Sequence, residues 1–466
     1  MNAGKKTFDA TGLDNARLQR VRDWLDTQIS SNRLMGASVL IGKGGEQVFF
    51  HATGVAGSNA QADATTTQHE TAQASTAQTN RVSSSEEQLR PFQRDTIVRL
   101  YSMTKPVTTC AAMMLYEQGH FQLDDPIAWY LPAFADMRVW TGQGELGTAE
   151  DMRNHTTTAD KAITVRQLMN HTSGLTYGFM NTTPVDQYYR DEGLVFPGAS
   201  STLEALVDQL AQAPLLCQPG SQWNYSVATD VLGRLVEVWS GLSLADYFAQ
   251  HIFTPLGMKS TGFHVREADA QRFADLYGPA IAGDPGSIAS TSTKGQAVRQ
   301  TNGESPLDAP VPLDVLASST FLNEPPLYSG GGGLVGCADD FARFCQCLLN
   351  GGELDGERLL GRKTVEFMRK NQLPGNRDMA AMGQAVWSET SYNGIGFGLG
   401  FAVVLNPVEA GMLTSKGEHH WGGAASTFFW IDPLEDLYVI LLTQLYPSST
   451  YPLRTELRTA VYQSLV

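Results

Sequence analysis

Apolar side chains recur at two spacings along the chain, and the two spacings predict different elements. Residues 14–32 repeat apolar positions every three or four residues, which predicts an amphipathic helix. Residues 37–41 and 47–50 are instead rich in β-forming side chains, and the glycine-containing segment 42–45 separates them. The chain is therefore expected to begin with a helix and a β-hairpin.

Strand patterns return only near the other end of the chain. Residues 396–404, 426–431 and 437–442 predict three strands, and a helix is expected near 452–465. Helical patterns fill the middle, at residues 107–118, 164–170, 203–213, 230–239 and 339–349. This order predicts an α/β fold of the α+β type, with an antiparallel sheet built from both chain ends, flanking helices and an inserted mainly helical domain.

Two polar stretches interrupt these patterns. Residues 58–90 are mostly Ser, Thr, Gln and Ala, and residues 280–309 are polar and glycine-rich. Neither can bury enough apolar surface to offset an ordering entropy of about 1 to 2 kcal/mol per residue, so both are expected to be flexible insertions. The expected division is a sheet domain of residues 1–120 and 310–466, and a mainly helical domain of residues 121–309.

Composition narrows the class of protein. The chain has 466 residues, 42% of them hydrophobic, and a formal charge of −15, which disfavours nucleic acid as a partner. No apolar run follows the N-terminal lysines and none approaches the length of about 18 residues that a membrane span needs, so a cytoplasmic location without membrane association is expected. The five cysteines are an odd number near apolar runs, which predicts buried free thiols.

Ser102 and Lys105 are the first candidates for chemistry. Ser102 follows a β-leaning segment and precedes an apolar helical one, with Pro106 acceptable in the first helical turn. One turn would bring the Lys105 amine beneath the Ser102 hydroxyl, near the positive end of the helix dipole. A serine becomes a nucleophile when a neighbour removes its proton. The alternative is an N-cap serine followed by a surface lysine.

Other segments give this pair a context. Ser102-Met103-Thr104-Lys105 resembles the Ser-x-x-Lys motif of the serine β-lactamase and penicillin-binding-protein superfamily. Residues 168–175, Leu-Met-Asn-His-Thr-Ser-Gly-Leu, resemble the structural landmark that follows that motif. The resemblance extends from about residue 18 to the C-terminus outside the polar stretches. Within the superfamily the chain looks most like class C β-lactamases and, closer still, family VIII carboxylesterases, which implies the β-lactamase-like fold.

The second motif of class C enzymes, Tyr-x-Asn, resembles Tyr225-Ser226-Val227. The resemblance implies that Tyr225 shares proton transfer with Lys105. Val227 stands where those β-lactamases have Asn, a departure typical of the esterase relatives. A half-buried aromatic residue without a chemical role is the alternative interpretation of Tyr225.

The third motif departs further. In place of Lys-Thr-Gly the chain has Trp421-Gly422-Gly423, similar to the Trp-x-Gly form of family VIII esterases and related acyltransferases. The resemblance implies a substrate-binding segment just before the strand expected from 426, whose glycines allow close approach to a substrate, and an oxyanion hole formed by the N–H groups of Ser102 and Ala424. An apolar wall replaces the cation that would bind a β-lactam carboxylate. Lys416 is expected to be a surface residue.

Competing signals are weak. The glycine run 330–333 lacks the Lys and Ser/Thr of a phosphate loop and predicts a close-approach turn. The pairs His419/His420 and Cys345/Cys347 lack partners at metal-binding spacings, so no metal and no cofactor is expected.

These residues together predict a serine hydrolase that works through an acyl-enzyme, foremost a carboxylesterase acting on small or short-acyl esters. Hydrolysis of β-lactams or amides and acyl transfer are alternatives with the same chemistry. A non-catalytic penicillin-binding-like module is the alternative from another class. The sequence leaves the oligomeric state open.

Overall fold

The structure is a computed structural model that describes residues 12–58, 89–194, 202–279, 309–383 and 392–466. Most of the two polar stretches lies outside the described residues, so their expected flexibility stays a prediction. The predicted bounds of the first stretch are wrong at both ends, because Ser58 belongs to strand β2 and strand β3 begins at Leu89. No helix in the described ranges has the length and apolar character needed to cross a membrane.

The largest sheet of the described chain has eight strands in the order β12-β13-β14-β15-β16-β1-β2-β3, and every neighbouring pair is antiparallel. Its strands are β1 Gly36–Lys43, β2 Glu46–Ser58, β3 Leu89–Pro91, β12 Ile395–Phe397, β13 Ala402–Val404, β14 His419–Gly422, β15 Phe428–Asp432 and β16 Leu437–Thr443. The two chain ends meet where β1 pairs with β16, with Leu40 opposite Ile440. The predicted fold class is confirmed.

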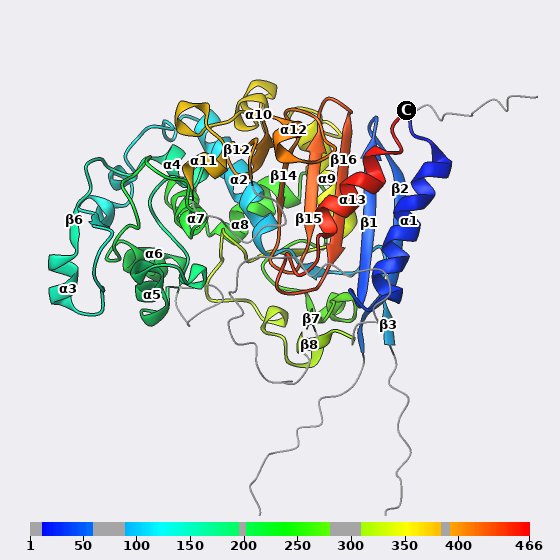
Figure 1. Cartoon of the computed structure of the whole chain (residues 1–466), viewed down its shortest axis with the longest axis horizontal. Coiled ribbons are helices and arrows are strands. Elements are labelled where there is room, and N and C mark those ends of the chain that lie inside the picture. The colour runs from blue at the N-terminus through cyan, green and yellow to red at the C-terminus, as the bar shows by residue number, and fades with distance from the viewer. Residues whose placement is uncertain (1–11, 59–88, 195–201, 280–308, 384–391) are drawn as a thin grey trace, which may run out of the picture.

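Alternating side chains give this sheet two apolar faces. Val39 and Leu441 belong to a cluster with α1 (Asn15–Ser30) and α13 (Leu453–Tyr462). Leu40 and Ile440 point the other way, into the main core that also contains α2 (Thr104–Glu117) and α9 (Ala338–Leu349). Figure 1 shows α1 and α13 lying along the strands at the sheet side of the molecule. The sheet is thus buried between two layers of helices.

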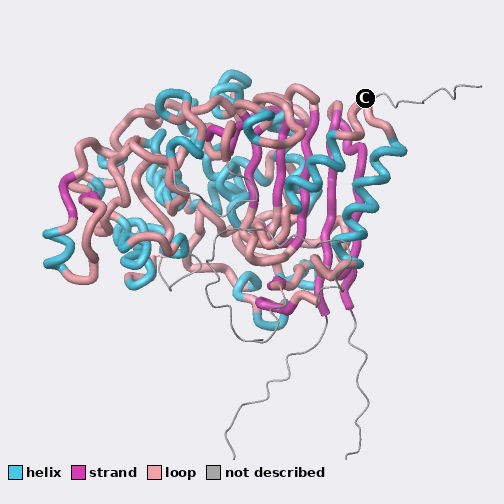
Figure 2. The backbone as a smooth tube through the Cα atoms, viewed as in Figure 1, coloured by secondary structure: helices cyan, strands magenta, loops and turns pink. Residues whose placement is uncertain are grey.

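Helices and short strands fill the other half of the molecule, as Figure 2 shows. The helices there are α3 Ala149–Asn154, α4 Val165–Met169, α5 Pro184–Asp191, α6 Leu203–Leu210, α7 Ala228–Ser240 and α8 Leu244–Phe248. The short strand pairs of the described chain, some of which lie beside the large sheet, are β4 Val98–Arg99 with β9 Val335–Gly336, β5 Arg138–Trp140 with β6 Thr156–Thr158, β7 Leu276–Gly278 with β8 Val311–Asp314, and β10 Glu353–Leu354 with β11 Glu357–Arg358. The remaining helices are α10 Arg362–Met368, α11 Met379–Met382 and α12 Pro407–Ala410. The expected domain boundaries stay a prediction.

The structure corrects the expected strands in three places. Residues 396–404 are not one strand but the hairpin of β12 and β13, whose turn includes Gly400 at φ +92°. Residues 419–422, expected only to precede a strand, form strand β14. The strand expected from 426 starts at Phe428, because Ser426 adopts a left-handed φ of +62°. The five cysteines are buried and free, as predicted.

Candidate active site

Ser102 lies at the junction between the sheet side of the core and helix α2. The 3₁₀ turn Tyr101–Met103 leads directly into α2, so the expected position at a helix N-terminus is confirmed. Tyr101 immediately before it has a left-handed φ of +46°, a conformation that strains a residue with a side chain. The strained turn presents Ser102 at the start of a helix whose first turns are buried.

Lys105 is a buried amine rather than a surface lysine. Only 1% of its surface is exposed, and its Nζ donates to Ser102 Oγ at 3.1 Å and to the carbonyl of Gly331 at 2.7 Å. In the described part of the chain no carboxylate forms an ion pair with it. An amine held by neutral acceptors is suited to exchange a proton with the serine beside it.

Tyr225 approaches the same serine from the loop before α7. Its hydroxyl lies 2.6 Å from Ser102 Oγ, and its ring centroid lies 4.6 Å from Lys105 Nζ. The structure therefore brings together the three side chains that the sequence singled out as catalytic candidates. Val227, two residues on, is buried and precedes the first residue of α7.

Strand β14 supplies the opposite wall of the site. The Trp421 ring contacts Tyr225 and Phe397, with centroid distances of 5.4 and 5.2 Å. A Cβ at Gly423 would lie 2.3 Å from the carbonyl oxygen of Leu100, so only glycine allows this strand end to reach the backbone that leads to Ser102. Gly422 leaves space for the side chain of Arg454, because a Cβ at residue 422 would lie 2.5 Å from the Arg454 guanidinium.

Two backbone N–H groups where β14 approaches Ser102 are free to donate hydrogen bonds. Gly423 donates to the carbonyl of Thr427 at 2.9 Å, which closes the turn that contains Ala424. Among the described residues, neither the Ser102 amide nor the Ala424 amide has a hydrogen-bond acceptor. Unpaired amides beside a nucleophile are the donors that an oxyanion hole requires.

Three residues next to Lys105 were not among the predicted site residues: Tyr177, Asp230 and Gly331. Asp230 Oδ1 accepts from the Gly331 amide at 3.0 Å and from the Ser329 hydroxyl at 2.5 Å, which holds the backbone of the residue whose carbonyl accepts from Lys105. Burial raises the pKa of Asp230. The ring centroid of Tyr177 lies 5.3 Å from Lys105 Nζ.

Part of this arrangement left a signal in the sequence. A Cβ at Gly331 would lie 2.5 Å from Asp230 Oδ2, which confirms the close approach predicted for the glycine run. Asp230 and Tyr177 could not be found in that way, since a lone acid on a helix and a lone tyrosine are common surface or core residues.

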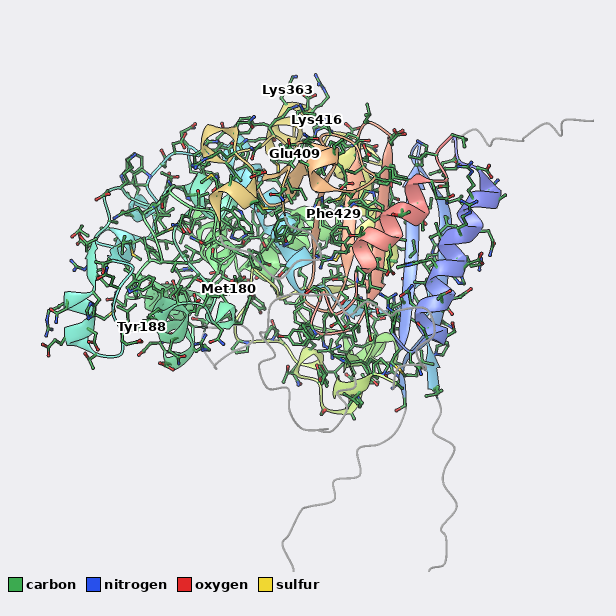
Figure 3. The ribbon with its side chains drawn as sticks, viewed as in Figure 1. Met180, Tyr188, Lys363, Glu409, Lys416 and Phe429 are labelled. Atoms are coloured by element: carbon green, nitrogen blue, oxygen red, sulfur yellow. The ribbon has the colours of Figure 1, made fainter. Side chains whose placement is uncertain are left out.

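The remaining candidates lie elsewhere. His420 Nδ1 pairs with buried Glu418 at 2.8 Å, and burial lowers the pKa of His419 to about 3. Within the described residues no group of three or more His, Cys, Asp or Glu could hold a metal ion. Lys416 is exposed, as expected, and Figure 3 labels it toward the top of the view.

Fold and site together define a serine acyl-transfer enzyme built on an antiparallel sheet. The family described as Beta-lactamase matches residues 21–463. The chain therefore belongs to this family.

Individual relatives extend the match. The chain is 34% identical to Protein Rv1367c of Mycobacterium tuberculosis over 362 residues, covering 77% of this chain and 79% of that protein. It is 30% identical to Esterase EstB of Burkholderia gladioli, covering 99% of this chain and 100% of that protein. The solved structure of EstCE1, described as a hydrolase with promiscuous acyltransferase activity, superposes with a TM-score of 0.68 at 28% identity and covers 96% of this chain and 99% of that one. These similarities confirm the expected superfamily and the class of esterase-like serine hydrolase.

Proposed function

We propose that the chain is a carboxylesterase for small or short-acyl esters in which Ser102 is the nucleophile and Lys105 and Tyr225 move its proton. The observation that carries this proposal is the pair of contacts to Ser102 Oγ, 3.1 Å from Lys105 Nζ and 2.6 Å from the Tyr225 hydroxyl. A hydroxyl held by two proton-transfer groups is prepared for attack on a carbonyl.

The reaction would proceed in two halves. Ser102 Oγ bonds to the ester carbonyl carbon while its proton passes to the Lys105–Tyr225 pair, and the amides of Ser102 and Ala424 bind the oxyanion. The carbon–oxygen bond to the alcohol then breaks, and the pair returns the proton to the departing oxygen. Water attacks the acyl-enzyme by the same route, which releases the acid and restores the Ser102 hydroxyl.

Aromatic walls favour neutral, apolar esters as substrates. Trp421 stands where the β-lactamase motif has its cationic Lys, and it packs with Phe397 and Tyr225. An apolar surface gains nothing from a substrate carboxylate, which would lose its hydration on entry. EstB, 30% identical along nearly the whole chain, carries the name of an esterase.

Active-site labelling tests the proposal directly. A fluorophosphonate probe is expected to label the full chain at Ser102, and Ser102→Ala is expected to lose both labelling and hydrolysis of p-nitrophenyl butyrate. Absence of Ser102-dependent labelling and turnover would favour a non-catalytic module instead. A chromogenic cephalosporin should be the poorer substrate, and a marked preference for it would reverse the assignment to esters.

Acyl transfer to an alcohol is the second candidate function. The description of EstCE1, which is 28% identical to this chain, includes acyltransferase activity beside hydrolysis. An alcohol can replace water in the second half-reaction without any change in the catalytic groups. Adding a primary alcohol during turnover of p-nitrophenyl butyrate should then yield a butyrate ester beside butyric acid, measurable by chromatography.

A further inference from the structure

The segment of residues 168–175 ends helix α4 and passes beside Tyr225. At the helix end, the Thr172 amide donates to the carbonyl of Gln167 at 2.9 Å, and the His171 amide points at that of Leu168 at 3.5 Å. This is a Schellman ending, in which the residue at the His171 position adopts a left-handed conformation. His171 has φ +56°, which glycine tolerates better than any other residue. The helix end therefore does not need a histidine side chain.

The contacts of His171 explain what the side chain does instead. Its carbonyl accepts from the Asn224 amide at 2.8 Å, and its Nδ1 lies 3.2 Å from Ser226 Oγ. The Ala228 amide donates to the same Ser226 oxygen at 3.4 Å, which leaves the hydroxyl proton available for Nδ1. One residue thus holds the neighbours of Tyr225 on both sides.

The imidazole ring also supports the phenol itself. The ring centroids of His171 and Tyr225 are 5.1 Å apart, and Phe397 packs on the imidazole at 5.4 Å. His171 is 1% exposed, and burial together with the charge of Lys105 holds its pKa well below its usual value. His171 is therefore a neutral, buried ring that packs against Tyr225.

We infer that His171 is a positioning residue for the reaction, which holds Tyr225 from three sides so that its hydroxyl stays on Ser102 Oγ. The inference rests on the proposed role of Tyr225 in proton transfer. Small displacements of a proton-transfer group cost rate rather than substrate affinity, because the group acts on the reacting atoms.

His171→Gly separates this role from the helix ending. Glycine favours the left-handed backbone, so the variant is expected to fold, while the ring and its bond to Ser226 are lost. With p-nitrophenyl butyrate, kcat should fall about 10- to 100-fold while KM stays within about twofold. The rate of fluorophosphonate labelling at Ser102 should fall with it. His120→Gly, at an exposed histidine, is the matched control and should leave both rates unchanged.

Ser226→Ala provides a second route to the same contact. It removes the Nδ1 partner but keeps the His171 ring, and kcat is expected to fall about 3- to 10-fold with KM unchanged. His171→Gly combined with Ser226→Ala should be no slower than His171→Gly alone, because both remove one interaction. Thermal melting of each variant establishes that it is folded, and Ser226→Ala still tests the contact if His171→Gly is not.

Two results would overturn the inference: a folded His171→Gly enzyme with native kcat, or losses that multiply in the double variant. Both leave the proposed function intact as long as the native chain is labelled at Ser102. Failure of that labelling would remove the proposed function itself.

Discussion

The Trp421 ring packs against the Tyr225 ring with their centroids 5.4 Å apart and their planes inclined by 51°. Nearly two hundred positions of sequence separate the two residues, yet Phe397 contacts Trp421 edge-on and completes one aromatic wall. The wall borders Ser102 through the phenol of Tyr225. Under the proposed function, substrate contact and the orientation of the phenol therefore depend on the same rings.

Replacing Trp421 tests this shared dependence. Trp421→Ala is expected to lower kcat/KM for p-nitrophenyl butyrate about tenfold or more, because it opens the wall and removes a support of Tyr225. Trp421→Phe keeps a ring, and Trp421 Nε1 has no hydrogen-bond partner within the described residues, so most activity should remain. Steady-state kinetics of the two variants checks this, and equal activity of Trp421→Ala and the native chain would contradict it.

Gly423→Ala should harm the enzyme through sterics alone. The new Cβ would lie 2.3 Å from both the Leu100 carbonyl and Thr427 Oγ1, so the turn with the Ala424 amide must move. Overpacking of this kind costs about 1 to 3 kcal/mol of stability, and kcat should drop at least tenfold. Gly147→Ala is the control, since a Cβ there meets nothing within 4 Å. Denaturant unfolding and kinetics of both variants decide, and similar behaviour would refute the steric account.

Glu418 should make stability depend on acid pH. Burial alone would raise its pKa, but the Arg458 guanidinium, with His420, holds the pKa well below its usual value. An acid with a depressed folded pKa contributes stability above its unfolded value of about 4.3, and the contribution is lost as pH falls below that value. Glu418→Gln leaves Arg458 buried without its charge partner and should cost about 3 to 5 kcal/mol at pH 7.

The free energy of unfolding of the native chain and of Glu418→Gln, measured between pH 3 and pH 7, tests this prediction. The native chain should lose more stability than Glu418→Gln over this interval, because only the native chain has this carboxylate to protonate. Parallel curves would show that Glu418 does not carry the dependence.

Phe179 is expected to influence substrate choice. Its ring is 38% exposed and stacks on Tyr177 at 4.5 Å, and Tyr177 in turn lies beside Lys105 and Tyr225. Phe179→Ala should lower kcat/KM about 2- to 10-fold for phenyl-bearing esters relative to ethyl esters, because an aromatic contact is lost. Phe367→Ala on α10, where the ring is 41% exposed, is the control. An unchanged ratio of the two ester classes in Phe179→Ala would exclude the contact.

Periodicity was sufficient for the elements that one face or one turn defines. The helices near α1, α2, α7, α9 and α13 and the hairpin of β1 and β2 were predicted, because their apolar spacing reflects local burial. The hairpin of β12 and β13 was not predicted, because its turn is as apolar as its strands and only Gly398 and Gly400 indicate it. Strand β14 was not predicted either, because four residues are too few to show a strand pattern.

The site residues also fall into those that the sequence predicts and those that it does not. Ser102, Lys105, Tyr225 and Trp421 occur in short strings with a recognisable order, so the sequence was enough to bring them together. Asp230 and Tyr177 act through contacts that exist only after folding, such as the hold of Asp230 on the Gly331 peptide. A residue such as Asp230, which acts by holding the backbone of another segment, leaves no characteristic spacing in the sequence.

The pairing of β1 with β16 can form only late in synthesis, because β16 lies near the end of the chain. Ser102 and Lys105 emerge from the ribosome early, but the strand that carries Trp421 and the strands that anchor it are made about three hundred residues later. Pairings of such long separation form slowly. A nascent chain therefore carries Ser102 long before it has the Ala424 amide, so under the proposed mechanism reactivity should appear only when translation is nearly complete.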